Sequence, residues 1–329
     1  MTDKIRWGIL STGLIAGLFT EDLRRLPDAE VTAVGSRTAE AAQAFADRYG
    51  IARAHGSWAE LAADPDVDIV YIANTNNGHY AAAELCLNAG KAVLCEKPFT
   101  LNAAEARALM DLAAARGCFL MEAMWMRCNP AIRRMSELIA DGTIGQVRTV
   151  QAEFCVPGPF ASSHRLRDPR LGGGALLDLG VYLVSFAHLI LGAPTTISAI
   201  ATLTPEGVDE NTGILLGYAG GAIASLTCGI GSDTPANALA AGPLGHIAAG
   251  PLFFLPSELR LHRADAGPEI VTIAYQGGGM GYEAAEAMRC LREGLLESPL
   301  VPWRATLEVM QIMDTVRQQI GVSFPGEAR

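Results

Sequence analysis

The chain has 329 residues, of which 50% are hydrophobic and 18% charged, a composition that excludes a disordered protein and favours two domains. An excess of 35 acidic over 25 basic residues gives a net charge of −10, which disfavours nucleic acid and anionic membranes as partners. The seven cysteines show neither CxxC pairs nor Cys/His ligand spacing, so we expect reduced thiols and no metal. We predict neither a signal peptide nor a membrane span, and therefore a cytoplasmic protein.

The first 120 residues alternate short apolar stretches with helical patterns. The predicted strands, each bounded by turn residues, are Ile5–Leu10, Glu30–Ser36, Asp68–Ala73, Ala92–Glu96 and Phe119–Glu122. Apolar residues at helical spacing lie between them at Ala39–Tyr49, His79–Ala89 and Ala103–Arg116. Repeated βαβ units predict a Rossmann-type, doubly wound parallel sheet, which we assign to residues 1–123.

The pattern changes after Ala123. A helix at Asn129–Ala140 precedes a strand-rich stretch, with predicted strands at Val147–Val156, Thr196–Thr204, Gly213–Tyr218, Ala222–Thr227, Glu258–Arg263 and Glu269–Ala274. Helices are predicted near Tyr282–Glu297 and Arg304–Ile320, and the Gly/Pro-rich span Gly229–Pro256 is left unassigned. We therefore expect an α/β domain over residues 124–329 with a large, mostly antiparallel open sheet.

The first predicted strand leads directly into a small-residue turn that opens a helix. A dinucleotide-binding fingerprint falls on Ser11, Thr12, Gly13, Leu14, Ile15 and Ala16. Ser11 replaces the usual first glycine, and Ala16 occupies the third small position. Gly13 would let a pyrophosphate approach the backbone, where the amides of the helix N-terminus would bind it. A glycine after a strand is common, but its place at the start of a βαβ unit favours nucleotide binding.

The end of the second predicted strand bears on the choice of cofactor. Enzymes that use NAD place an acidic residue about twenty residues beyond the glycine turn, to bind the ribose 2′-hydroxyl. This sequence has Ser36 and Arg37 there. A guanidinium would bind a 2′-phosphate, whereas a carboxylate would repel it. We therefore predict NADP rather than NAD; the alternative is a solvated arginine at a strand end.

Two further motifs carry candidate chemistry. Lys97 follows a predicted strand, at the sheet edge where ligands bind, and Pro98 favours an extended backbone at Lys97. Such a lysine is often simply exposed to solvent. Three glycines from Gly172 precede an apolar helix that carries Asp178 and Tyr182 four residues apart, on one face. A carboxylate in so apolar a helix needs a partner, so a structural Asp–Tyr pair or a cap remains the alternative.

Glu96-Lys97-Pro98 together with the Gly-Gly-Gly-Ala-Leu-Leu-Asp-Leu-Gly-Val-Tyr run ending at Tyr182 makes the chain resemble the Gfo/Idh/MocA oxidoreductases. The resemblance is strongest to the dihydrodiol dehydrogenase and xylose dehydrogenase branch, where the Ser11 turn and the stretch Phe119–Arg127 are also similar. It covers essentially the whole chain. It implies a dehydrogenase that binds NAD(P) and often forms a homodimer.

The resemblance also implies roles for individual residues. Lys97, Asp178 and Tyr182 would be the catalytic set. The residues expected near the cofactor, beyond the glycine turn and Arg37, are Asn74, Asn76, His79, Glu96, Lys97, Trp125 and Arg127. The family's common Thr-Pro-Asn is Asn-Thr-Asn at residues 74–76, which leaves individual contacts of that turn open. His79 by itself is equally consistent with a structural histidine.

As a hypothesis, Tyr182 removes the proton of a substrate hydroxyl while Lys97 stabilises the phenolate and polarises the developing carbonyl. In the alternative, neutral Lys97 is the base and Tyr182 donates. Asp178 would accept a hydrogen bond from a substrate hydroxyl, and Arg165, before the three glycines, is a further candidate contact.

The expected substrate is a small sugar, polyol or trans-dihydrodiol. A non-catalytic NAD(P)-sensing protein on the same fold is the competing interpretation.

Overall fold

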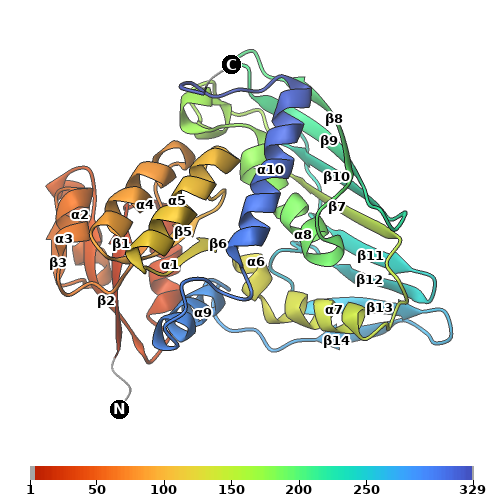
Figure 1. Ribbon diagram of the computed structural model, residues 1–329, viewed down its shortest axis with the longest axis horizontal. Coiled ribbons are helices and arrows are strands. Elements are labelled where there is room, and N and C mark those ends of the chain that lie inside the picture. The colour runs from red at the N-terminus through yellow and green to blue at the C-terminus, as the bar shows by residue number, and fades with distance from the viewer. Residues whose placement is uncertain (1–3, 328–329) are drawn as a thin grey trace. The chain divides into compact units, whose positions relative to one another are not determined.

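The computed structural model describes residues 4–327, which form two units, each built around one sheet (Figure 1). The first unit contains residues 4–100, Ala104–Trp125 and Gln276–Thr306, and the second contains Leu101–Ala103, Met126–Tyr275 and residues 307–327. The predicted division at residue 123 lies close to the crossing after Trp125. The division differs for Gln276–Thr306, which we assigned to the second domain and which packs with the first unit.

The sheet of the first unit has six parallel strands in the order β3-β2-β1-β4-β5-β6. The strands are β1 Ile5–Leu10, β2 Ala29–Gly35, β3 Arg53–His55, β4 Ile69–Ile72, β5 Ala92–Glu96 and β6 Leu120–Ala123. The helices are α1 Leu14–Leu23, α2 Ala39–Tyr49, α3 Trp58–Ala63, α4 His79–Asn88, α5 Ala103–Arg116 and α9 Gly281–Arg292. The predicted doubly wound sheet is confirmed, with its switch point between β1 and β4.

Two short elements of this unit, β3 and α3, were not predicted from the sequence. β3 has three residues and all of them are half-buried, so it lacks the apolar run that marked the other strands. α3 has six residues, too few to display a helical period, although Ser57 caps it by accepting a hydrogen bond from the Glu60 amide at 3.2 Å.

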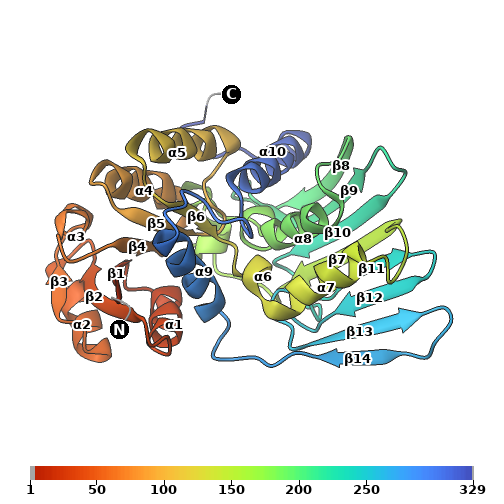
Figure 2. The same ribbon diagram turned by 60° about the horizontal axis from the view of Figure 1, so that its bottom comes forward.

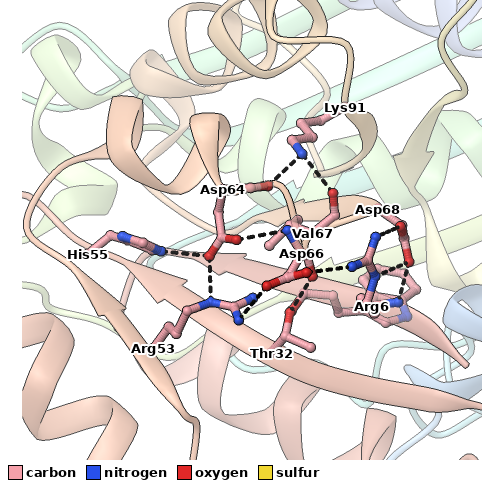
Figure 3. A network of polar contacts seen from close by, with 10 residues as sticks. Arg6, Thr32, Arg53, His55, Asp64, Asp66, Val67, Asp68 and Lys91 are labelled. Atoms are coloured by element: carbon pink, nitrogen blue, oxygen red, sulfur yellow. Dashed lines mark hydrogen bonds and ion pairs between the residues drawn. The ribbon is translucent and has the colours of Figure 1, made fainter.

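A polar network joins the amino-terminal ends of these strands (Figure 3). Its labelled members are Arg6, Thr32, Arg53, His55, Asp64, Asp66, Val67, Asp68 and Lys91. Asp64 accepts from Arg53 at 2.7 Å and contacts His55 Nε2 at 2.8 Å. Burial opposes ionisation of Asp64, but hydrogen bonds from the Asp66 amide, His55 and Arg53 hold its pKa below the usual value. Ligands bind at the opposite, carboxyl ends of parallel strands, so this network has a structural role.

Asp22 explains why the segment before α9 belongs to the first unit. Its carboxylate, at the end of α1, accepts backbone hydrogen bonds from Gly278 at 2.6 Å, Met280 at 2.9 Å and Gly281 at 3.4 Å. Gly277 has a φ of +65°, which favours glycine, and a Cβ added there would meet the Asp22 carboxylate at 2.5 Å. The glycines therefore let the chain close around a buried carboxylate, and α9 starts directly after them.

The second unit contains an eight-stranded sheet in the order β14-β13-β12-β11-β7-β10-β9-β8, in which β7 and β10 are parallel and the other neighbours antiparallel. The strands are β7 Thr149–Cys155, β8 Thr196–Leu203, β9 Asp209–Gly217, β10 Ile223–Gly229, β11 Ala238–Gly242, β12 Gly245–Ala249, β13 Glu258–Arg263 and β14 Glu269–Thr272. This confirms the predicted large, mostly antiparallel sheet. The hairpin of β11 and β12 lies in the span left unassigned.

Helices cover one face of this sheet. They are α6 Trp125–Cys128, α7 Pro130–Ala140, α8 Val181–Leu191 and α10 Trp303–Ile320. Figures 1 and 2 show α7, α8 and α10 against one face, whereas no helix of the described residues lies over the other. That other face exposes large apolar side chains, with Ile200 79% exposed, Ile270 63%, Ile223 54% and Leu215 53%. The register of the strands places all four on the same side of the sheet.

The stretch Pro169–Leu191 is, by length and composition alone, apolar enough to cross a membrane. Of its most apolar window, 83% is buried within the protein, as in the core helix of a folded domain. All seven cysteines are buried, and none is in a disulfide, which confirms the expected free thiols.

Candidate functional site

The glycine turn after β1 has the backbone of a dinucleotide-binding turn, despite its serine. Ser11 adopts a φ of +105°, a conformation that favours glycine, and its amide donates to the Gly35 carbonyl at 2.9 Å. Gly13 directly precedes α1, and no side chain caps the helix. A Cβ on Gly13 would meet only Ser11 Oγ, at 3.9 Å. The turn therefore leaves backbone amides and space for a diphosphate.

Leu14, Ile15 and Ala16 form the first turn of α1. Leu14 is 83% exposed, whereas Ala16 is fully buried against the sheet. Gly17, next in the chain, packs against the Tyr49 hydroxyl, which a Cβ would meet at 2.5 Å. Close contact of α1 with its surroundings thus rests on Ala16 and Gly17 together, while Leu14 stays on the exposed side.

Ser36 and Arg37 follow β2, as predicted. Ser36 is buried, and its amide donates to the His55 carbonyl at 3.2 Å. Arg37 is exposed and makes no hydrogen bond or ion pair with any residue of the described range 4–327. Thr38 then caps α2 by accepting from the Ala41 amide at 3.2 Å. The edge of the sheet next to the glycine turn therefore presents an unpaired guanidinium.

The turns after β4 and β5 are tied together by His79. Its Nδ1 lies 2.8 Å from the Pro98 carbonyl oxygen and its Nε2 lies 3.2 Å from that of Asn74. Complete burial lowers the pKa of His79; the two carbonyl contacts oppose this, and the Lys97 charge adds to it. A neutral imidazole has one N–H, so it donates to one carbonyl at a time. His79 is therefore a structural link between the two turns.

Asn74 supplies a second feature that fits a bound cofactor. Both its amide nitrogen and its amide oxygen are buried and have no hydrogen-bond partner in the described chain. Buried polar groups are almost always paired, so an unpaired amide in this turn is suited to a ligand. Asn76 lies in the same turn and is 9% exposed, in the single helical turn Asn76–Gly78.

Lys97 follows β5 at the carboxyl edge of the sheet, and its peptide bond to Pro98 is cis. Its backbone amide donates to Glu96 Oε2 at 3.1 Å, and Glu96 Oε1 accepts from the Tyr71 hydroxyl at 2.5 Å. Glu96, which we expected beside the cofactor, is thus buried and turned toward Tyr71 and the backbone of Lys97. Its hydrogen bond therefore helps to fix the backbone at Lys97.

In the second unit, the three glycines from Gly172 allow the turn that carries Arg165 to pack closely against them. The amide of Gly173 donates to the Asp168 carbonyl at 3.1 Å, and that of Gly174 to the Leu166 carbonyl at 2.8 Å. A Cβ on Gly173 would lie 2.7 Å from the Arg165 carbonyl oxygen. The glycines are therefore required to seat this turn.

The seated turn directs Arg165 at Asp178. Its Nη1 and Nη2 donate to Asp178 Oδ1 and Oδ2 at 2.9 and 3.1 Å, with side-chain exposures of 50% for Arg165 and 10% for Asp178. Burial lowers the pKa of Arg165, but the hydrogen bonds and charge of Asp178 outweigh it and raise the pKa overall. Asp178, expected as a catalytic group, is thereby held as an ionised acceptor.

Asp178 lies in a π-helical turn, Leu176–Gly180, that runs into α8. We predicted one regular helix here, and the wider turn is the difference. Asp209 at the start of β9 stabilises it, since its Oδ2 accepts from the Leu176 amide at 2.7 Å and from Thr212 Oγ1 at 2.8 Å. π-Turns are frequent at functional sites. Nothing in the sequence distinguishes Asp209 from other acids near strand ends, so it was missed.

Tyr182 occupies the first turn of α8 and is 6% exposed. Its ring lies 4.8 Å from that of Phe254 and 6.0 Å from that of Phe154, and the two phenylalanines lie 4.9 Å apart, measured between ring centroids. These two aromatic residues were also missed, because Phe154 lies in a strand and Phe254 in a turn of the unassigned span, and no motif links them. Together the three rings form an aromatic cluster around the candidate phenol.

Trp125 and Arg127 both lie on α6, the short helix after β6. Trp125 is half-buried. Arg127 is 7% exposed, and its guanidinium contacts Ser185 and His188 of α8. The expected contact of these two residues with the cofactor stays a prediction.

Comparison with known proteins identifies relatives over the whole chain. The model of the oxidoreductase family with an NAD-binding Rossmann fold matches residues 5–124, and that of the GFO/IDH/MocA C-terminal domain matches residues 132–243. The trans-1,2-dihydrobenzene-1,2-diol dehydrogenases of Mus musculus and Homo sapiens are 43% and 39% identical to this chain, each alignment covering 99% of both proteins.

Solved structures also share this fold. A 3-ketoreductase from Actinomadura kijaniata, in complex with NADP and TDP-benzene, is 29% identical with a TM-score of 0.86, over 97% of this chain and 98% of the other. A levoglucosan dehydrogenase in complex with NADH and levoglucosan has a TM-score of 0.89 over 97% and 98% of the two chains. At 20% identity, this second likeness concerns the fold alone.

Proposed function

Because the chain belongs to the Gfo/Idh/MocA family of NAD(P)-dependent oxidoreductases, we propose that it oxidises a small trans-dihydrodiol, with NADP⁺ accepting the hydride. The observation that carries this proposal is the environment of Tyr182, where a phenol lies within an aromatic cluster on the helical run that also presents Asp178. The oxidation of a cyclic diol needs a proton acceptor, an apolar surface that contacts the ring and a carboxylate that binds a hydroxyl.

The preference for NADP rests on the end of β2. Arg37 is exposed and unpaired within the described chain, and no carboxylate follows β2 at Ser36 or Arg37. A guanidinium donates two hydrogen bonds to a phosphate, so it favours the 2′-phosphate of NADP. The NADP bound to the 29% identical 3-ketoreductase supports the same choice. Gly13 and Asn74 would hold the diphosphate and a polar group of the dinucleotide.

The substrate class follows from the relatives and from the aromatic cluster. The relatives at 43% and 39% identity act, by their names, on trans-1,2-dihydrobenzene-1,2-diol. The rings of Phe154 and Phe254 beside Tyr182 would pack against an unsaturated six-membered ring. A sugar, which is polar on most sides, would gain less from such a surface. Sugars therefore rank below dihydrodiols as substrates.

The chemistry requires that one hydroxyl of the diol loses its proton as its carbon loses a hydride. Bound NADP⁺ supplies the hydride acceptor. We assign the proton to the Tyr182 oxygen, with the ammonium of Lys97 lowering the energy of the phenolate, because a phenol of pKa about 10 is a poor base without a cation. Asp178, ionised beside Arg165, accepts a hydrogen bond from the neighbouring hydroxyl. The products are a hydroxyketone, NADPH and a proton.

The oligomeric state is part of the proposal. The helix-free face of the eight-stranded sheet exposes Ile200, Leu215, Ile223 and Ile270. Large apolar side chains gathered on one face of a sheet are typical of an interface between proteins. We infer that a second copy covers this face in a homodimer. Sedimentation of wild type and of Leu215→Glu tests this, and a wild-type monomer would refute it.

The test of function measures absorbance at 340 nm with purified protein, NADP⁺ or NAD⁺, and trans-dihydrobenzenediol, xylose or levoglucosan. We expect turnover of the diol with NADP⁺. Tyr182→Phe and Lys97→Met should each lower kcat by roughly 10²–10⁴-fold, the usual contribution of acid–base catalysis, while NADPH still binds. Wild-type turnover of sugars but not of the diol would refute the substrate class. Near-normal kcat in both variants would refute the mechanism.

A further inference from the structure

A buried chain of polar groups crosses the second unit and includes α8, the helix that carries Tyr182. It begins at Arg127, whose Nε donates to Ser185 Oγ at 3.0 Å and whose Nη2 donates to the Ser185 carbonyl at 3.3 Å. The same Nη2 lies 3.2 Å from His188 Nδ1. His188 Nε2 in turn lies 2.7 Å from Glu308 Oε2 on α10. Three helices, α6, α8 and α10, are therefore joined through one histidine.

The partners of His188 fix where its hydrogen lies. A guanidinium can only donate, so Nδ1 of His188 must be the acceptor of the Arg127 contact. Nε2 then carries the hydrogen and donates to the carboxylate of Glu308. The chain is thus ordered as cation, neutral imidazole and anion, with each bond pointing in one direction. Arg127 is 7% exposed and His188 9%, so loss of a partner would leave a buried polar group unpaired.

These contacts matter because the rest of α8 is held by apolar packing. Its residues from Val181 to His188 are all buried, and most of them are apolar. Apolar packing is not directional, whereas hydrogen bonds fix the rotation and the axial position of a helix. Ser185 lies one turn beyond Tyr182, on the neighbouring surface of the helix, and His188 lies about one turn further. Fixing these two residues fixes Tyr182.

We propose that Arg127, His188 and Glu308 are positioning residues that set the place of the Tyr182 hydroxyl by locking the rotation of α8. The inference rests on the proposed role of Tyr182 as the proton acceptor. It gives Arg127 a function within the second unit that does not involve touching substrate. A misplacement of a reacting group by about 1 Å can lower a rate by about 100-fold, so a lock of this kind has a measurable effect.

The experiment compares three variants, with kcat, the KM for NADP⁺ and the pH dependence of kcat as readouts. His188→Leu and Glu308→Leu break the chain, whereas Glu308→Gln keeps an oxygen that accepts from His188. We expect the two leucine variants to lower kcat by at least about tenfold and to shift the pH profile of kcat, because the phenol changes its surroundings. The KM for NADP⁺ should stay within about twofold, and Glu308→Gln should restore most of kcat.

The matched control is Arg317→Met. Arg317 is similarly buried, at 6% exposed, and lies on α10, where it donates to Asp314 at 2.7 Å and to Glu327 at 2.7 and 2.9 Å. This variant should lower the thermal stability of the protein but leave the pH profile of kcat unchanged. Equal shifts in the pH profile for the control and for His188→Leu would show a general effect of destabilisation, and the proposal would then be wrong.

The remaining outcomes separate this inference from the proposed function. If Tyr182→Phe abolishes turnover while folded Glu308→Leu keeps the wild-type kcat and pH profile, the lock is refuted and the catalytic phenol stands. If Tyr182→Phe is fully active, the proposed mechanism itself fails. Should His188→Leu not fold, Glu308→Leu and Glu308→Gln still decide the question, because Glu308 is 21% exposed and its replacement leaves the bond of Arg127 to His188 in place.

Discussion

Arg165 binds both carboxylate oxygens of Asp178, at 2.9 and 3.1 Å, in a bidentate ion pair on the helical run that continues to Tyr182. The pair decides what Asp178 can do. A carboxylate held by a guanidinium stays ionised at neutral pH and still has lone pairs for a further donor. It therefore suits hydrogen bonding to a substrate hydroxyl rather than the uptake of a catalytic proton, in keeping with the proposed role of Tyr182 as the proton acceptor.

Replacement of Arg165 should impair the use of substrate but not the binding of cofactor. In Arg165→Met, Asp178 loses two charge-assisted hydrogen bonds and its fixed orientation. Bonds of this type contribute about 1.5–3 kcal/mol, so we expect kcat/KM for the diol to fall by roughly 10–100-fold. Steady-state kinetics together with titration of NADPH fluorescence measures both effects. An unchanged kcat/KM would contradict the assigned role of the pair.

The matched control for this variant is Arg170→Met. Arg170 lies in the same turn and also forms a bidentate pair, with Asp168, but it is 79% exposed. Exposed pairs contribute little, and this one does not involve Asp178. The control should therefore behave as wild type in both assays.

Arg37 should decide between the two cofactors. Arg37→Ala removes the guanidinium that would bind the 2′-phosphate and leaves the glycine turn intact, so NADP⁺ should lose affinity while NAD⁺ should not. We expect the KM for NADP⁺ to rise by roughly 10–100-fold, the value of one or two charge-assisted hydrogen bonds. The KM for NAD⁺ should change by less than about threefold. A parallel rise in both would show that Arg37 does not discriminate between them.

Much of the first unit followed from the sequence because its strands are buried on both faces. Such strands read as apolar runs, and the glycine turn after β1 marks the nucleotide edge. The serine at position 11 left the geometry of that turn open, and the φ of +105° at Ser11 supplies the answer. The lysine at the end of β5 was placed correctly for the same reason, since its strand is one of those apolar runs.

The contacts that complete the candidate site could not be predicted, because they join residues distant in sequence. Asp209 meets the amide of Leu176 across 33 residues, and Glu308 meets His188 across 120. Neither acid belongs to a motif. The sequence also predicted a regular helix around Asp178, because a π-turn has no compositional mark. It assigned α9 to the second domain, because the hydrogen bond of Asp22 that attaches the segment before α9 to the first unit joins residues distant in sequence.

Asp209 should be needed for the π-turn that presents Asp178. Asp209→Ala leaves the Leu176 amide and the Thr212 hydroxyl buried without their acceptor, which should lower the free energy of unfolding by about 1–3 kcal/mol and reduce kcat/KM. Burial raises the pKa of Asp209, although Thr212 and the Leu176 amide oppose the shift, so the charge itself is costly. Asp209→Asn, which keeps an oxygen acceptor, should therefore lose less. Urea denaturation compares the two variants, and an equal loss in both would exclude this explanation.

Because of Glu283, the free energy of unfolding should fall as the pH rises. This residue of α9 is fully buried, and neither carboxyl oxygen has a hydrogen-bond partner in the described chain. Burial raises its pKa well above the usual value, and the charges of Glu96, Glu122 and Asp22 raise it further. The folded state therefore keeps a proton that the unfolded state releases above about pH 4.3. Stability falls as the pH rises through that window, by up to about 1.4 kcal/mol for each pH unit, until the folded pKa is reached.

Glu283→Gln removes this proton and keeps the shape of the neutral acid, so its unfolding free energy should fall less than that of wild type as the pH rises above about 4.3. Glu286→Gln is the control on the same helix. Burial opposes the ionisation of Glu286, but hydrogen bonds from Arg289 and Ser298 lower its pKa overall, so its carboxylate is stabilising once ionised. This control should lose stability at neutral pH and gain none at alkaline pH. Parallel stability curves for wild type and Glu283→Gln would show that Glu283 is already ionised in the folded protein.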